Sequence, residues 1–159
     1  MQPFPRKIRV SIAAQRLDLL EISATERLLA SFPVSTSGFG LGFELGSNKT
    51  PLGRFAVAEK IGEGAPLGTV FASRVPTGEV AAFENPDDPS DRVTTRILWL
   101  EGLDPENANT RERYIYIHGT NHEERIGEPC SHGCVRMRNA DVAQLFGQVE
   151  AGTEVTIVP

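Results

Sequence analysis

Residues 8–34 read IRVSIAAQRLDLLEISATERLLASFPV and indicate a fold that is built from strands. Over residues 8–12 apolar residues alternate with polar ones, as in a strand that buries one face. Residues 17–22 and 27–34 have a similar character, and the short connections between these segments predict a meander of hairpins. We therefore expect three strands joined by hairpins at the start of the chain.

Further strands are expected along the rest of the chain, separated by loops that contain Gly, Pro and Ser. Residues 35–50 are rich in Ser and Gly and predict a loop, after which TPLGRF at 50–55 turns the chain into a strand that ends at residue 58. The remaining segments that resemble strands are residues 96–100, 114–117 and 153–158.

One short helix is predicted near the C-terminal end. Asn139 suits the N-cap position, and Asp141 in the first turn favours the positive end of the helix dipole. The apolar residues that follow have helical spacing, so that one face packs on the core; they are Val142, Leu145, Phe146 and Val149. The fold class that we predict is mainly β, a single small β-sandwich or barrel-like domain over residues 1–159 with one short helix after Cys134.

Residues 62–91 form the longest segment without a regular pattern, because Gly and Pro interrupt its apolar residues repeatedly. Long loops inside compact domains are usually functional lids or binding loops. We expect an irregular insertion here, which is either a lid over a site or a passive surface loop.

The composition excludes several classes of protein. The chain has 159 residues with 16 Lys and Arg against 21 Asp and Glu, a net charge of −5, so nucleic acid is not an expected partner. No membrane is expected either, since no stretch approaches the roughly 20 apolar residues that cross a bilayer. Residues 10–14 are too short for the apolar part of a signal peptide, so we expect a cytoplasmic protein, or a periplasmic one if a native signal peptide has been removed.

The chemistry is concentrated in residues 118–136, HGTNHEERIGEPCSHGCVR, which contain all three histidines and both cysteines. Such clustering indicates a site rather than filling of a core. Two kinds of site fit these residues: a cysteine nucleophile with a histidine base, or a metal centre.

The nucleophile interpretation requires Cys134 to be activated by His118. A free thiol is only slightly ionised at pH 7, and a neighbouring imidazole can take its proton. Gly119 next to the base allows close backbone approach, and Gly133 permits a tight turn with backbone N–H groups that form an oxyanion hole. In an extended strand Arg136 points to the same side as Cys134, where it would lower the thiol pKa and bind a substrate carboxylate.

The metal interpretation rests on the alternation of Cys130, His132 and Cys134 and on the i, i+4 spacing of His118 and His122. Familiar zinc sites pair their ligands two to four residues apart in turns, and the sequence has no C-x-x-C. We expect no metal and no other cofactor, with a zinc- or peptide-binding module without activity as the remote alternative.

SHGCVR at 131–136, preceded by HGTN at 118–121 and by TPLGRF at 50–55, resembles the signature of the L,D-transpeptidase (YkuD-type) catalytic domain. The resemblance implies a nucleophile, Cys134, and a general acid/base, His118, which the backbone carbonyl of Gly119 orients. It also implies a cleft and oxyanion site formed by Ser131, His132 and Gly133, and substrate binding by Arg136 and Asn121.

The substrate that this resemblance implies is the peptidoglycan stem tetrapeptide, cut between its third residue and the terminal D-Ala. A cytoplasmic enzyme would meet soluble muropeptides from wall turnover, so we expect an L,D-carboxypeptidase of muropeptide recycling. The alternative is a transpeptidase that forms 3-3 cross-links or attaches acceptors in the wall. In either case Cys134 is the residue that a carbapenem would acylate.

Overall fold

The computed structural model describes residues 4–159 and is dominated by strands. The strands are β1 (Arg6–Ser11), β2 (Arg16–Ile22), β3 (Glu26–Ser35), β4 (Gly53–Ile61), β5 (Thr69–Ala72), β6 (Val75–Val80), β7 (Val93–Gly102), β8 (Tyr116–Gly119), β9 (Val135–Met137) and β10 (Glu154–Val158). The helices are a 3-10 turn, η1 (Glu123–Arg125), and one α-helix, α1 (Asn139–Phe146).

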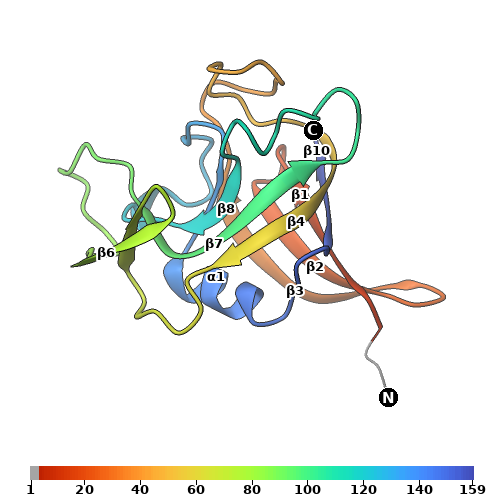
Figure 1. The fold of residues 1–159 in the computed structure, drawn as a ribbon, viewed down its shortest axis with the longest axis horizontal. Coiled ribbons are helices and arrows are strands. Elements are labelled where there is room, and N and C mark those ends of the chain that lie inside the picture. Colours follow the sequence, from red (N-terminus) through yellow and green to blue (C-terminus); the bar gives the residue numbers. More distant parts are fainter. Residues whose placement is uncertain (1–3) are drawn as a thin grey trace.

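The sheet closes on itself. Its strand order is β4-β10-β1-β2-β3-β9-β8-β7-β5-β6, and an additional pairing joins β4 to β7. Two pairs of neighbours are parallel, β1 with β10 and β8 with β9, while the other pairs are antiparallel. In Figure 1, β4 and β7 lie side by side with α1 below them, and the β6 hairpin projects at the left of the view.

The alternation of side chains in β8 and β9 separates the core from an outer face. Ile117, Val135 and Met137 are fully buried in the main core, together with the apolar residues of α1. Tyr116, which alternates with Ile117, packs instead in a smaller cluster outside the barrel that also contacts Cys134. The reactive residues of the sequence therefore belong to the outer face of this part of the barrel.

The predicted fold class is confirmed, and two of its details are wrong. The 62–91 insertion is not wholly irregular, because β5 and β6 form a hairpin on β7. Asn139 is not the N-cap of the helix: Arg138 has the extended backbone of the cap, and Asn139 is the first helical residue and completely buried.

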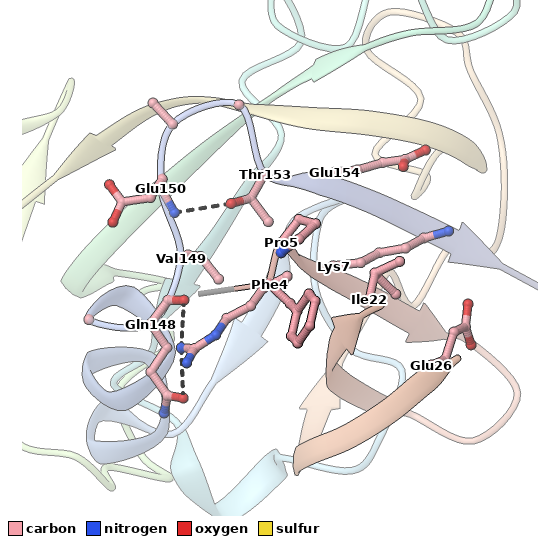
Figure 2. Close-up of a pocket in the computed structure, with 14 residues that line it drawn as sticks. Phe4, Pro5, Lys7, Ile22, Glu26, Gln148, Val149, Glu150, Thr153 and Glu154 are labelled. Carbon is pink, nitrogen blue, oxygen red and sulfur yellow. Dashed lines mark hydrogen bonds between the residues drawn. The ribbon is translucent and has the colours of Figure 1, made fainter. Parts of the chain in front are cut away.

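A cavity of about 720 Å³ lies away from the histidines and cysteines. Figure 2 shows it between the start of β1 and the loop after α1, with Phe4, Ile22 and Gln148 in its wall. None of its lining residues belongs to residues 118–136. No helix within residues 4–159 has the length and apolar character to cross a membrane.

Candidate active site

His118 is held rigidly on β8, a strand with neighbours on both sides. Its imidazole is buried, and Nδ1 lies 2.5 Å from the carbonyl oxygen of Gly119. Because a carbonyl can only accept, Nδ1 carries the proton and Nε2 keeps its lone pair. Burial lowers the pKa of His118, although the Gly119 carbonyl and the charge of Asp91 act in the opposite direction. The imidazole is therefore a neutral base at neutral pH.

Gly119 has no room for a side chain. A Cβ at this position would lie 2.7 Å from Oδ1 of Asn139 and 2.7 Å from the carbonyl oxygen of Thr94. The close backbone approach that we predicted at this glycine thus involves β7 and the start of α1. The same packing holds the Gly119 carbonyl against the His118 ring.

Cys134 lies immediately before β9 with its thiol half-buried. The sulfur is 3.3 Å from the backbone nitrogen of Tyr116, which donates to it, and 3.3 Å from the carbonyl oxygen of Tyr114, to which the thiol donates. Tyr114 itself has a φ of +57°, in a region that residues other than glycine seldom occupy. Such local strain beside a reactive group is frequent at functional sites.

Burial raises the pKa of the Cys134 thiol to about 11. The Tyr116 N–H group and the cations Arg136 and Arg113 act to lower this pKa, while the carboxylate of Asp91 acts to raise it. The sequence predicted that cations would lower the thiol pKa, and their effect is present but is smaller than that of burial. At rest the site therefore holds a neutral thiol and a neutral imidazole.

A tight turn at residues 131–134 presents the cysteine. Oγ of Ser131 accepts from the backbone nitrogen of Gly133 at 3.2 Å and donates to the carbonyl of Cys134 at 2.6 Å. Gly133 has a φ of +122°, and its carbonyl accepts from Oγ1 of the buried Thr50 at 3.0 Å. The TPLGRF element, far away in the sequence, thus supports this turn. Because Ser131 occupies the Gly133 N–H group, the Cys134 amide is the remaining candidate for an oxyanion donor in the turn.

Arg136 is the register partner of His118 in the parallel β8–β9 pair, so the two side chains lie on the same face. Its side chain is buried, with Nη2 2.5 Å from Oδ2 of Asp91 and Nη1 3.5 Å from Sγ of Cys130. Nε of Arg136 is buried without a hydrogen-bond partner. The predicted contact of Arg136 with substrate remains a prediction, because in this structure Asp91 already pairs with the guanidinium.

His132 and Asn121 contact the insertion. His132 is exposed, lies against Phe39 with ring centroids 5.8 Å apart, and places Nδ1 3.1 Å from Asp91. Asn121 is buried, and both ends of its amide contact the end of the insertion and the residue after it: Oδ1 accepts from the Arg92 nitrogen at 3.0 Å, and Nδ2 donates to the Ser90 carbonyl at 3.1 Å. The proposed role of Asn121 in substrate binding thus competes with a structural one.

Sequence reasoning missed Asp91, because nothing in its spacing connects the end of the insertion with residues 118–136. It also considered His122 as a possible metal ligand and did not place it against the insertion. His122 is largely buried, with Nε2 2.7 Å from the Ser90 carbonyl and Nδ1 3.1 Å from Glu124. Only the concentration of Pro and acidic residues before β7 could have suggested that this segment folds back on the site.

The cysteines and histidines do not form a ligand cluster. Cys130 and Cys134 are both free, and no group of three or more His, Cys, Asp or Glu side chains within residues 4–159 is arranged to hold a metal ion. A second cavity of about 330 Å³ lies beside the site, between the insertion and the 122–136 segment, and Cys130, His132 and Arg136 are among the residues that line it.

Comparison with known proteins shows which protein family the chain is related to. A family model described as the L,D-transpeptidase catalytic domain (YkuD) matches residues 5–157. YkuD of Bacillus subtilis is 28% identical over 153 residues, which are 96% of this chain and 66% of that protein. YqjB of Bacillus subtilis is 34% identical over 93 residues, which are 52% of this chain and 51% of that protein. The chain thus spans about half to two thirds of the length of these relatives.

The fold also matches solved structures. L,D-transpeptidase 3 from Mycobacterium tuberculosis, in complex with a faropenem-derived adduct, aligns with a TM-score of 0.59 and 18% identity over 97% of this chain and 60% of that chain. At this identity the likeness concerns the fold alone. Because the family model covers nearly the whole chain and the fold agrees with it, the protein belongs to the L,D-transpeptidase catalytic-domain (YkuD) family.

Proposed function

We propose that the protein is a cysteine-dependent acyl enzyme that acts on peptidoglycan stem tetrapeptides at the bond between the third residue and the terminal D-Ala. The observation that carries this proposal is a half-buried thiol and an imidazole, both of which lie beside Tyr116, with Nδ1 of the imidazole committed to the Gly119 carbonyl. That arrangement leaves Nε2 of His118 as the proton acceptor for Cys134. Membership of the YkuD family supports the choice of substrate.

The reaction that this pair supports has two halves. Nε2 of His118 takes the Cys134 proton while the sulfur attacks the carbonyl carbon of the third residue, and the Cys134 amide donates to the oxygen that becomes negative. The imidazolium then gives its proton to the amine of D-Ala as the C–N bond breaks, which leaves a thioester. In the second half His118 takes a proton from water, which attacks the thioester and releases the tripeptide and the thiol.

We favour hydrolysis over transfer to a second stem peptide because of the insertion. Its last residues are fixed beside the site by Asn121 and His122, and the Phe83 carbonyl accepts from the Glu123 nitrogen at 2.9 Å. A segment anchored at these points narrows the space for an acceptor chain while leaving room for water. The description of the family as transpeptidases favours cross-linking as the second candidate.

Incubation of the pure protein with a disaccharide tetrapeptide, followed by mass spectrometry, tests the proposal. We expect tripeptide and free D-Ala from the wild type and neither product from Cys134→Ala. Dimeric product in excess of tripeptide would replace hydrolysis by transpeptidation. Equal turnover by Cys134→Ala would end the cysteine mechanism.

A further inference from the structure

Asp91 is the last acidic residue of the insertion, and its carboxylate contacts the 118–136 segment. Its Oδ2 lies 2.5 Å from Nη2 of Arg136 and 3.1 Å from Nδ1 of His132, and 29% of its side chain is exposed. The carboxylate thus joins an exposed imidazole to a buried guanidinium. Within the proposed function, on which this inference rests, no role has been given to it.

The backbone on both sides of Asp91 is fixed. The carbonyl of Ser90 accepts from Nδ2 of Asn121 at 3.1 Å and from Nε2 of His122 at 2.7 Å, and the Arg92 nitrogen donates to Oδ1 of Asn121 at 3.0 Å. Two side chains of the 118–136 segment therefore hold the residues before and after Asp91. The position of its carboxylate is set by the site itself and not by a loose loop.

The charge of Asp91 acts on both reacting groups. The charged groups that face Cys134 are Arg136 from β9, Arg113 from the turn before β8, and Asp91, so that Asp91 is the one carboxylate among them in the described residues. The same carboxylate and Arg136 face His118, whose other neighbours are the Gly119 carbonyl and the Tyr116 ring at 6.5 Å. Although burial acts to raise the pKa of Asp91, the positive charges of protonated His118 and of Arg136 hold it below its ordinary value.

We propose that Asp91 is a positioning residue of this active site, which holds Arg136 and His132 in place and sets the charge that surrounds the Cys134–His118 pair. An unpaired guanidinium at this point would be a buried cation beside the reacting groups. With Asp91 in place the pair of charges is close to neutral, and the imidazolium that forms during reaction has a carboxylate nearby.

If the charge of Asp91 acts on the site, its removal should change the pH dependence of the Cys134 reaction rate in a specific way. Removing a negative charge lowers the pKa of every neighbouring group that can bind a proton, so the thiol and the imidazole should both titrate at lower pH. Loss of packing alone would instead change how accessible the thiol is. A change in accessibility scales the height of a rate–pH curve, whereas a change in charge moves the curve along the pH axis.

The test measures alkylation of Cys134 by iodoacetamide from pH 6 to pH 11, followed on the Cys134 peptide by mass spectrometry so that Cys130 does not interfere. For Asp91→Asn we expect the curve to move about one unit toward lower pH, or about tenfold faster alkylation at pH 8. Asp87→Asn, an exposed residue of the same insertion with the same charge change, should leave the curve in place. Asp91→Glu, which keeps the charge, should restore most of the wild-type curve.

An unchanged curve for Asp91→Asn, or an equal movement for Asp87→Asn, would overturn the inference. If Asp91→Asn does not fold, Arg136→Gln and the double variant Asp91→Asn/Arg136→Gln replace it, because the double variant leaves no buried charge unpaired. The step from Arg136→Gln to the double variant removes only the Asp91 charge and should again move the curve to lower pH. No stem peptide is used here, so absence of tetrapeptide cleavage by the wild type would refute the proposed function without affecting this result.

Discussion

Replacing Asn139 by Ala removes four hydrogen bonds of one side chain, three of them buried and one partly buried. Oδ1 of Asn139 accepts from the hydroxyl of Thr94 at 2.6 Å and from the hydroxyl of Thr95, while Nδ2 donates to the Thr120 carbonyl at 2.9 Å and to a Glu123 carboxylate oxygen at 2.7 Å. An asparagine amide can make four such bonds, so its capacity is used in full. The residue ties β7, the end of β8, η1 and α1 together.

The decrease in the free energy of unfolding on replacing Asn139 shows whether this residue joins the four elements or only caps the helix. A neutral hydrogen bond contributes about 1 kcal/mol and one to a charged group about 2 kcal/mol, so that the four bonds together are worth about 5 kcal/mol. An N-cap residue, which the sequence suggested, would cost only about 1 kcal/mol when replaced by Ala. We expect Asn139→Ala to lower the free energy of unfolding by the larger amount, because the Thr94 and Thr95 hydroxyls that lose this acceptor are buried.

Urea unfolding followed by circular dichroism measures this difference. Arg138→Ala is the matched control, since Arg138 stands at the actual cap position, is exposed and makes no side-chain cap hydrogen bond. The control should change the free energy of unfolding by less than about 0.5 kcal/mol. A cost for Asn139→Ala near 1 kcal/mol would show that these four bonds do not hold the elements together, and the argument for their role would fail.

Three further outcomes are expected. In His118→Gln the thiol loses its base, so cleavage of the stem tetrapeptide should fall by about 10²–10⁴-fold, while the midpoint of Cys134 alkylation stays near the wild-type value because a neutral imidazole does not set the thiol pKa. Gly133→Ala forces an alanine to a φ of +122° with its Cβ 3.3 Å from the Lys49 carbonyl, so thermal unfolding should report a loss of about 2 kcal/mol. Because the pKa of folded His118 is below its ordinary value, the unfolded chain binds a proton that the folded chain does not, so the free energy of unfolding should fall as the pH drops below about 6.5. In His118→Gln, urea titrations should show a weaker decrease over the same range, and an unchanged decrease would exclude His118 as its source.

The strands that bury alternate side chains could be predicted from the sequence, whereas the hairpin of the insertion could not. The expected segments at 17–22, 27–34 and 153–158 lie within one residue of β2, β3 and β10 at each end. All six residues of β6 are exposed, so no apolar pattern identifies it as a strand. Its place is set by backbone pairing with β5, which in turn pairs with β7.

The sequence predicted which residues of the 118–136 segment belong to the candidate site. It could not predict which charged groups pair with them. The extended spacing predicted Arg136 on the same side as Cys134, and the register of β8 and β9 places Arg136 beside His118. The contact between Asp91 and Arg136 joins residues 45 positions apart through a segment with no strand pattern. Whether a cation such as Arg136 is free or paired depends on that contact, which local sequence spacing does not encode.

The neutral resting state of the pair explains how such a site stays unreactive until substrate arrives. Because burial raises the thiol pKa to about 11 and lowers the His118 pKa, moving the proton from sulfur to imidazole at rest is unfavourable. A buried thiol in this state resists alkylation and oxidation, because the thiolate is the reactive form. In the proposed reaction substrate supplies the missing free energy, through the bond that the sulfur forms and the oxyanion that the Cys134 amide stabilises. Proton transfer and attack are then parts of one step, and the carboxylate of Asp91 favours the imidazolium although it disfavours a free thiolate.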